Sequence, residues 1–200
     1  MTSNLLALIV LVYIGGLLLL RQRQHALLGY TWSAFGFAMV LILAGQYGGW
    51  HDVLGHLQAL ILRAAASSIN VNLELLGQSN LVVPDPTGWS VLSIGIECST
   101  LIEASVFAGI MLFYPRFPLQ ERLLRTGIGI AATFLINLVR LSVITLVIAW
   151  FGKPAVPVAH AFIGRLIFFV GIVGVYWYML TLPTLRMVKR DLEVTGRSVL

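Results

Sequence analysis

The stretch that decides the fold is TGIGIAATFLINLVRLSVITLVIAWF, residues 126–151, an apolar run interrupted by Asn137 and Arg140. A hydrocarbon core about 30 Å thick needs roughly 20 apolar residues in a helix, and this run is longer than that. An arginine at the centre of such a helix costs at least about 2.5–3.5 kcal/mol. The run therefore predicts a membrane-spanning helix, and Arg140 either snorkels to the outer headgroups or serves a function.

The composition indicates an integral membrane protein. Apolar residues make up 58% of the 200 residues and charged residues only 10%, against about 25% charged residues in soluble domains. The formal net charge of +5 does not indicate nucleic-acid binding, because the basic residues lie beside apolar runs, where they set orientation and meet anionic lipid headgroups.

Apolar runs and turn signals predict an all-α membrane bundle of about five spanning helices within one domain, residues 1–200. The first run is taken as a retained helix, because its charges follow it and no cleavage site is evident. Segment 52–66 is predicted to be an amphipathic helix on or in the membrane. Alternating residues before and after the turn signals at 77–80 and 84–88 predict a small β-hairpin. The predicted spans are 4–20, 27–47, 98–114, 126–150 and 161–182.

Loop charge predicts the orientation. Basic residues concentrate in 21–25, 116–125 and 186–190, and the positive-inside bias places these segments in the cytoplasm. Segment 48–97 is then extracytoplasmic. Arg140 lies 14 residues into its run, about 21 Å from the cytoplasmic end. Cys98 and His160 begin their spans at the outer surface, so all three polar groups are predicted at the same leaflet.

Cys98 is the only cysteine. A free cysteine is commonly a small buried hydrophobe, but this one is predicted at a helix N-terminus, where the dipole favours a thiolate. A nearby histidine that takes the thiol proton, with a donor for the oxyanion, would support acyl transfer. His160 is the candidate base. His51 and His56 are rivals at the same surface, whereas His25 is predicted to be cytoplasmic.

Five further polar residues are predicted to support this site. Asn137 shares a helical face with Arg140, three residues earlier. Glu97 is expected to orient a partner or cap the helix. Glu103 is expected to pair with Arg140 or Arg165, and Arg165 otherwise snorkels or contacts substrate. Ser99 flanks Cys98 on its other side. No metal-ligand spacing of cysteine and histidine occurs, and no cofactor is expected.

The ordered set Glu97-Cys98-Ser99, Asn137-x-x-Arg140 and His160 before a last apolar run resembles the exosortase/archaeosortase family. The resemblance covers about residues 90–175, and the length is similar to that of the compact Gram-positive type. The family motif continues Cys-Ser-Gly, whereas this chain has Thr100 in place of the glycine. Family members are multi-pass cysteine transpeptidases, unrelated in fold to soluble sortases.

The resemblance implies a thiol protease or transpeptidase of the bacterial cell membrane, with its active site facing outward. Its partner would be a secreted protein with a C-terminal transmembrane sorting signal, cut near that helix and passed to an unknown surface acceptor. It implies Cys98 as nucleophile, Arg140 as transition-state donor and His160 as base. The alternative is a non-catalytic transporter, or an assembly module of a surface-polymer export system, in which Arg140, Glu103 and Arg165 line a polar path.

Overall fold

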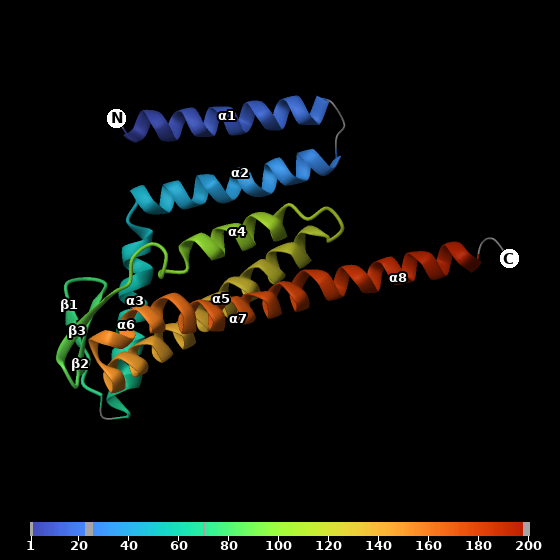
Figure 1. The fold of residues 1–200 in the computed structure, drawn as a ribbon. Coiled ribbons are helices and arrows are strands. Elements are labelled where there is room, and N and C mark those ends of the chain that lie inside the picture. The colour runs from blue at the N-terminus through green and yellow to red at the C-terminus, as the bar shows by residue number, and fades with distance from the viewer. Residues whose placement is uncertain (1, 23–25, 70, 198–200) are drawn as a thin grey trace.

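The computed structural model describes residues 2–22, 26–69 and 71–197 of the chain (Figure 1). Helices dominate these residues, and one small sheet interrupts them. The long helices are α1 (Thr2–Gln22), α2 (Ala26–Tyr47), α3 (Trp50–Ser67), α4 (Leu101–Leu112), α5 (Leu119–Phe151), α7 (Gly164–Tyr176) and α8 (Leu182–Arg197). Short helical turns η1 (Lys153–Ala155), α6 (Val156–Val158), η2 (Ala159–Ile163) and η3 (Trp177–Thr181) join α5, α7 and α8.

Three helical stretches among the described residues are long and apolar enough to cross a membrane: α2, α5 and the continuous run Lys153–Glu193. Leu6–Leu20 in α1 and Leu101–Leu112, which is α4, are apolar but shorter. The membrane class predicted from composition is therefore supported by the helices, while the expected number of spans is not confirmed. The predicted span 98–114 is shorter than expected because its helix begins only at Leu101 and ends at Leu112.

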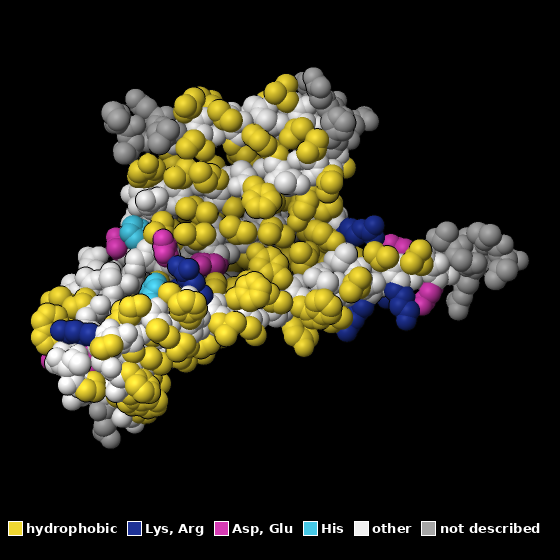
Figure 2. All heavy atoms as spheres, in the orientation of Figure 1, with side chains coloured by type: hydrophobic (Ala, Val, Ile, Leu, Met, Phe, Trp, Pro, Cys, Tyr) yellow, Lys and Arg dark blue, Asp and Glu magenta, His cyan; other side chains and the backbone are white. Residues whose placement is uncertain are grey.

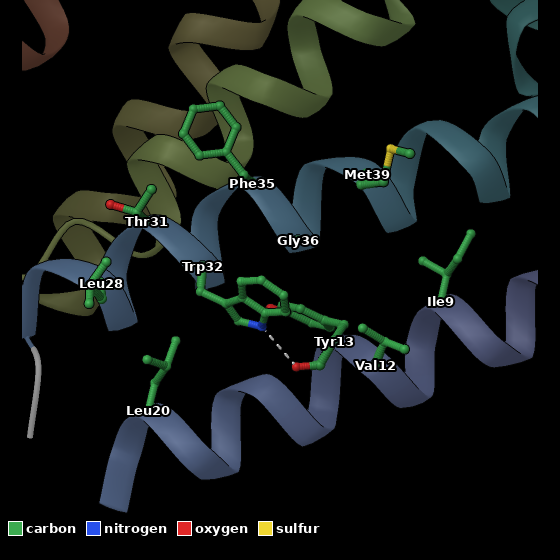
Figure 3. A pocket seen from close by; sticks show the side chains of 10 residues that line it. All are labelled: Ile9, Val12, Tyr13, Leu20, Leu28, Thr31, Trp32, Phe35, Gly36 and Met39. Atoms are coloured by element: carbon green, nitrogen blue, oxygen red, sulfur yellow. Dashed lines mark hydrogen bonds between the residues drawn. The ribbon is translucent and has the colours of Figure 1, made fainter. Parts of the chain in front are cut away.

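Helix α1 packs mainly on α2, where aromatic side chains fit over glycines. Trp32 lies over Gly16, and Tyr13 lies over Gly36, so a Cβ at either glycine would meet an aromatic ring. Trp32 Nε1 donates to the Tyr13 carbonyl at 3.1 Å (Figure 3). A hollow of about 480 Å³ remains between these two helices, and its lining is almost wholly apolar. Small residues that let helices approach closely are typical of packing inside membranes.

The two ends of the bundle differ in chemistry. Figure 1 places the sheet and α3 at one end, and the turn between α4 and α5 at the other, where α8 extends beyond the bundle. The basic segments 116–125 and 186–190 belong to this second end. Residues 186–190, which follow the last predicted span, continue its helix as part of α8.

The sheet has three antiparallel strands, β1 (Glu74–Leu76), β2 (Asn80–Asp85) and β3 (Gly88–Ser93), in the order β1–β2–β3. The prediction of a small β-structure is thus correct in kind, but a third strand is added. The alternating residues before Glu74 form no strand, because the end of α3 ties them back: the backbone N–H groups of Ile69 and Val71 both donate to the Ala66 carbonyl. Position 70 lies outside the described residues.

Helix α3 confirms the amphipathic helix predicted over 52–66. Its buried positions recur every three or four residues, as expected for one face of a helix: Gly55, Gln58, Ala59, Leu62 and Ala66. This face joins the inner side of the sheet and part of α5 in one core, which includes Leu81, Val83, Ile144 and Cys98. The core therefore fixes the sheet end of the bundle, where the candidate residues lie.

Candidate functional site

The three groups singled out in the sequence lie within reach of one another at the sheet end of the bundle. The distance from Cys98 Sγ to His160 Nε2 is 3.4 Å. Arg140 Nη2 donates to Cys98 Sγ at 3.8 Å. The sulfur comes from the turn before α4, the guanidinium from α5 and the imidazole from the turn before α7. Three segments distant in sequence thus converge on one sulfur atom.

The turn that carries Cys98 is held by buried polar side chains. Asn137 Nδ2 donates to the Cys98 carbonyl at 2.5 Å, and Ser99 Oγ donates to the Ile96 carbonyl at 3.1 Å. Gln58 Nε2 donates to Thr100 Oγ1 at 2.7 Å. Asn137, Ser99, Thr100 and Gln58 are all nearly inaccessible to solvent. Asn137 and Arg140, which share a helical face, both bind Cys98: Asn137 donates to its backbone carbonyl and Arg140 donates to its sulfur.

Thr100 adopts a left-handed conformation, with φ +71°. Such a conformation is unusual for a β-branched residue and costs energy unless the surroundings impose it. Among the described residues it is the only non-glycine with positive φ. It stands at the N-cap of α4, where the motif that this stretch resembles has glycine, which adopts this conformation without strain.

The environment of Cys98 differs from the one predicted. The helix begins at Leu101, so Cys98 lies before its first turn, and the dipole acts mainly within the first turn. Burial raises the pKa of the Cys98 thiol, while the nearby charge of Arg140 acts to lower it. The thiol is therefore protonated at rest near neutral pH, and it needs a base to become a nucleophile.

His160 is the histidine that meets this need. It lies in the π-helical turn η2, and single π-helical turns occur frequently at functional sites. The rivals have other contacts: His56 Nδ1 bonds the Gln78 carbonyl at 2.6 Å, and His51 pairs with Asp52 at 3.5 Å. His25 lies outside the described residues.

Arg140 is buried rather than snorkelling, with 5% of its surface exposed. Its guanidinium lies over the ring of Phe168, 5.4 Å from the ring centroid. Its Nε is buried without a hydrogen-bond partner. No ion pair with a carboxylate is formed by Arg140 among the residues that the structure describes. Arg140 thus places a cationic donor next to the sulfur, and its Nε–H group is not used in a hydrogen bond with any described residue.

A cavity of about 380 Å³ opens beside these groups. Figure 2 shows acidic, basic and histidine side chains gathered in a hollow between the upper helices and α7, on a face that is otherwise mostly apolar. One part of the lining is polar, formed by Glu97, Glu103, Arg140, His160 and Arg165, and the other is apolar and comes from α7, with Phe168, Phe169 and Ile172. From His160 to Ile172 the cavity wall advances twelve residues, which corresponds to about 18 Å along the helix.

Glu97, Glu103 and Arg165 all line this cavity. The expected direct ion pair of Glu103 with Arg140 or Arg165 is not formed among the described residues, and Glu103 Oε2 is buried without a hydrogen-bond partner. Glu97 is exposed, and α4 has no side-chain cap, so the predicted capping role is also wrong. Glu97 and Glu103 instead place two carboxyl groups in the cavity wall.

Two contacts of the site were missed in the sequence. Gln58 is the one polar residue on the buried face of α3. A polar residue on an otherwise apolar helical face indicates a buried hydrogen bond, so the sequence did contain a signal for this contact. Phe168 gave no signal, because one phenylalanine in an apolar run resembles any other. The apolar hollow of Figure 3 has no charged lining residue. No group of three metal-ligating residues occurs within the described ranges.

Comparisons with known proteins add no assignment: no family model, no curated protein and no solved structure matches this chain. The functional argument therefore rests on the sequence motif and on the geometry around Cys98.

Proposed function

We propose that this chain is a membrane-embedded cysteine peptidase or transpeptidase that acts on a secreted polypeptide at the outer membrane surface. The observation that carries the proposal is the convergence on Cys98 Sγ of an imidazole nitrogen at 3.4 Å and a guanidinium nitrogen at 3.8 Å. A thiol, a base and an oxyanion donor are the three parts that acyl transfer requires.

The chemistry follows from these positions. Cys98 Sγ attacks a peptide carbonyl carbon while its proton passes to His160 Nε2, and the Arg140 guanidinium stabilises the negative charge that develops on the carbonyl oxygen. Collapse of the intermediate breaks the C–N bond, and His160 returns the proton to the leaving amine. The resulting thioester is attacked by water or by an acceptor amine, which releases the thiol.

The cavity supports a substrate that emerges from a membrane helix. Its charged end includes Arg140 and His160, the two residues that contact the sulfur, and its apolar end follows α7 from Phe168 to Ile172. A polypeptide with an apolar helix next to its scissile bond matches this change in polarity. The wall of the cavity is formed by groups from α4, α5 and α7, so the bond would be cut beside the bundle rather than inside a closed chamber.

The bacterial cell membrane and an outward-facing site are part of the proposal, and the charge distribution supports them. The basic segments lie at the end opposite the sheet, and basic loops favour the cytoplasmic side. The sheet end, with Cys98 and His160, would then face outward, where secreted proteins are encountered.

Two measurements on intact cells that produce the chain test this function. The first is labelling of Cys98 by a membrane-impermeant maleimide added outside, which should occur and should slow when Arg140 is replaced. The second is mass analysis of secreted proteins that carry a C-terminal apolar helix and basic tail. Trimmed products should appear with the wild type and be absent with Cys98→Ala, Cys98→Ser and His160→Ala.

His56→Ala is the matched control, because His56 is a histidine of the same end of the bundle that contacts Gln78 rather than Cys98. It should leave trimming intact. Trimming by a folded Cys98→Ala protein would overturn the proposal. Absence of both labelling and trimming would favour the non-catalytic transporter or assembly module.

A further inference from the structure

The sheet ends in a strand whose outer edge is open. β3 pairs only with β2, and the register joins Asp85 to Gly88, Pro84 to Trp89 and Val83 to Ser90. Proline has no N–H, and residues of an antiparallel pair alternate between bonded and unbonded positions. The bonded positions of β3 are therefore Ser90 and Leu92.

The backbone N–H and C=O groups of Trp89, Val91 and Ser93 consequently point away from the sheet. None of the irregular backbone hydrogen bonds within the described residues reaches them. The side chains of all three residues are exposed, Trp89 at 61% and Val91 at 45%. A polypeptide in extended conformation could thus approach this edge.

The strand itself carries none of the residues that normally protect such an edge, although Lys153 Nζ lies over the ring of Trp89, 5.5 Å from its centroid. Proteins block open edges with short strands, charged residues or proline. β1, the opposite edge, has three residues and contains Glu74. β3 has six residues, Gly-Trp-Ser-Val-Leu-Ser, with neither charge nor proline. An unprotected edge of this length is suited to binding another strand.

The open edge leads to the candidate nucleophile. From Ser93 to Cys98 the chain advances five residues, which is at most about 17 Å. Its path is fixed by the Ile94 N–H bonded to Ser79 and the Cys98 N–H bonded to Gly95. A peptide paired with β3 therefore reaches the sulfur within about five of its own residues.

Gly95 lies between β3 and Cys98, and this chain gives no internal reason for a glycine there. It is exposed, a Cβ would meet nothing within 4 Å, and it is absent from the glycines with positive φ. A glycine in an extended segment often marks the close approach of another backbone.

We propose that the outer edge of β3, residues 89–93, binds an extended segment of the polypeptide substrate as a fourth strand and so delivers its scissile carbonyl to Cys98. This inference rests on the proposed function. Backbone pairing gives affinity independent of sequence, and pockets for alternate side chains add specificity. A second copy of the chain is the other strand that could pair here, and the test below separates the two.

The test uses the purified full chain in lipid nanodiscs and two thiol-directed probes. One is a mixture of acetylated tetrapeptidyl chloromethyl ketones randomised at every position, and the other is N-acetylalanyl chloromethyl ketone. In both, Cys98 Sγ displaces chloride, forms a thioether and loses its proton. The tetrapeptides should alkylate Cys98 about tenfold faster or more, equivalent to about 1.4 kcal/mol. Backbone N-methylation of the tetrapeptides should abolish this advantage.

Val91→Pro removes an outward N–H without removing a bond to β2, and it should reduce the ratio of the two rates to about one. Val91→Ala is the matched control: it shortens the side chain, keeps the N–H and should keep the ratio. Gly95→Val should reduce the ratio as Val91→Pro does.

Equal rates for the two probes on the wild type, or a ratio that survives Val91→Pro, would overturn the edge proposal while leaving the proposed function standing. A wild-type dimer that Val91→Pro converts to a monomer would assign the edge to a second copy and overturn it as well. Failure of either probe to alkylate Cys98 faster than free cysteine would instead overturn the proposed function, and the edge proposal with it.

Discussion

Replacing Thr100 with glycine sets two measurable effects against each other. The left-handed conformation of Thr100, φ +71°, costs about 1–2 kcal/mol in an L-residue, and glycine would remove that cost. The same change deletes the hydroxyl that accepts from the fully buried Gln58 at 2.7 Å. A buried donor left without a partner costs about 1–3 kcal/mol. The two effects nearly cancel, so Thr100→Gly alone should be neutral or destabilise by about 1 kcal/mol.

The Gln58→Met background separates these effects. Methionine fills a similar volume without an amide, and Gln58 Oε1 already lacks a partner, so little hydrogen bonding is lost on that side. In this background Thr100→Gly has only strain to relieve, and it should stabilise the protein by about 1–2 kcal/mol. The double-mutant cycle should therefore give a coupling of about 1–3 kcal/mol.

The assay is thermal unfolding of the purified protein in a fixed detergent, followed by the fluorescence of its five tryptophans. A change of 1 kcal/mol shifts the midpoint by about 2–4 °C in a chain of this size. A gain from Thr100→Gly that is equal in both backgrounds would refute the hydrogen bond as a stabilising contact. An equal loss in both would refute the strain.

Three further predictions follow from contacts of the site and the sheet. Asn137→Leu leaves the Cys98 carbonyl without its donor and should lower the free energy of unfolding by about 1–3 kcal/mol. The control is Ser142→Ala, whose hydroxyl donates to the Leu138 carbonyl of its own helix. It should have little effect in the same thermal assay. Because burial raises the pKa of Cys98, its alkylation rate in a His160→Ala variant, which lacks the proposed base, should keep rising about tenfold per pH unit beyond the ordinary thiol pKa of about 8.5, and a plateau below that pH would contradict this. Hydrogen bonds from Ser90, and to a smaller extent from Thr87, hold the pKa of the Asp85 carboxyl below its usual value. The stability that these bonds add is complete above the ordinary carboxyl pKa and is lost as pH falls through the lower pKa of the folded state. Asp85→Asn should abolish this acid dependence, which is measured by the protease susceptibility of the sheet.

Periodicity and charge predicted the parts of the fold that depend on one-dimensional patterns. The apolar runs located α2 within one residue and the C-terminal end of α5 likewise, although α5 begins seven residues earlier than predicted, at Leu119, because a helix in lipid needs a continuous apolar stretch but can extend beyond it. Alternating chain direction then brought Cys98 and His160 to the same end. Buried spacing along α3 confirmed its amphipathic character.

What the sequence could not predict depends on rotation and local irregularity. Depth in a membrane does not say which way Arg140 faces, and its contact with Phe168 follows from how α5 and α7 pack. The start of α4 at Leu101 depends on a left-handed residue that no pattern requires. The strand predicted before the turn at 77–80 is shorter than its alternation indicated, since only Glu74–Leu76 pair and the end of α3 binds the residues before them.

The resting contacts of Arg140 bear most directly on whether this geometry can promote a reaction. A donor that is already saturated by a carboxylate binds the ground state and the transition state alike, and so adds nothing to the rate. Arg140 is held instead by the face of Phe168 and by one long contact to sulfur, and its Nε remains unpartnered. Leaving a buried donor unsatisfied is costly in the resting protein. An oxyanion forming beside Cys98 would remove that cost at the moment of bond making, which is the differential stabilisation that catalysis requires.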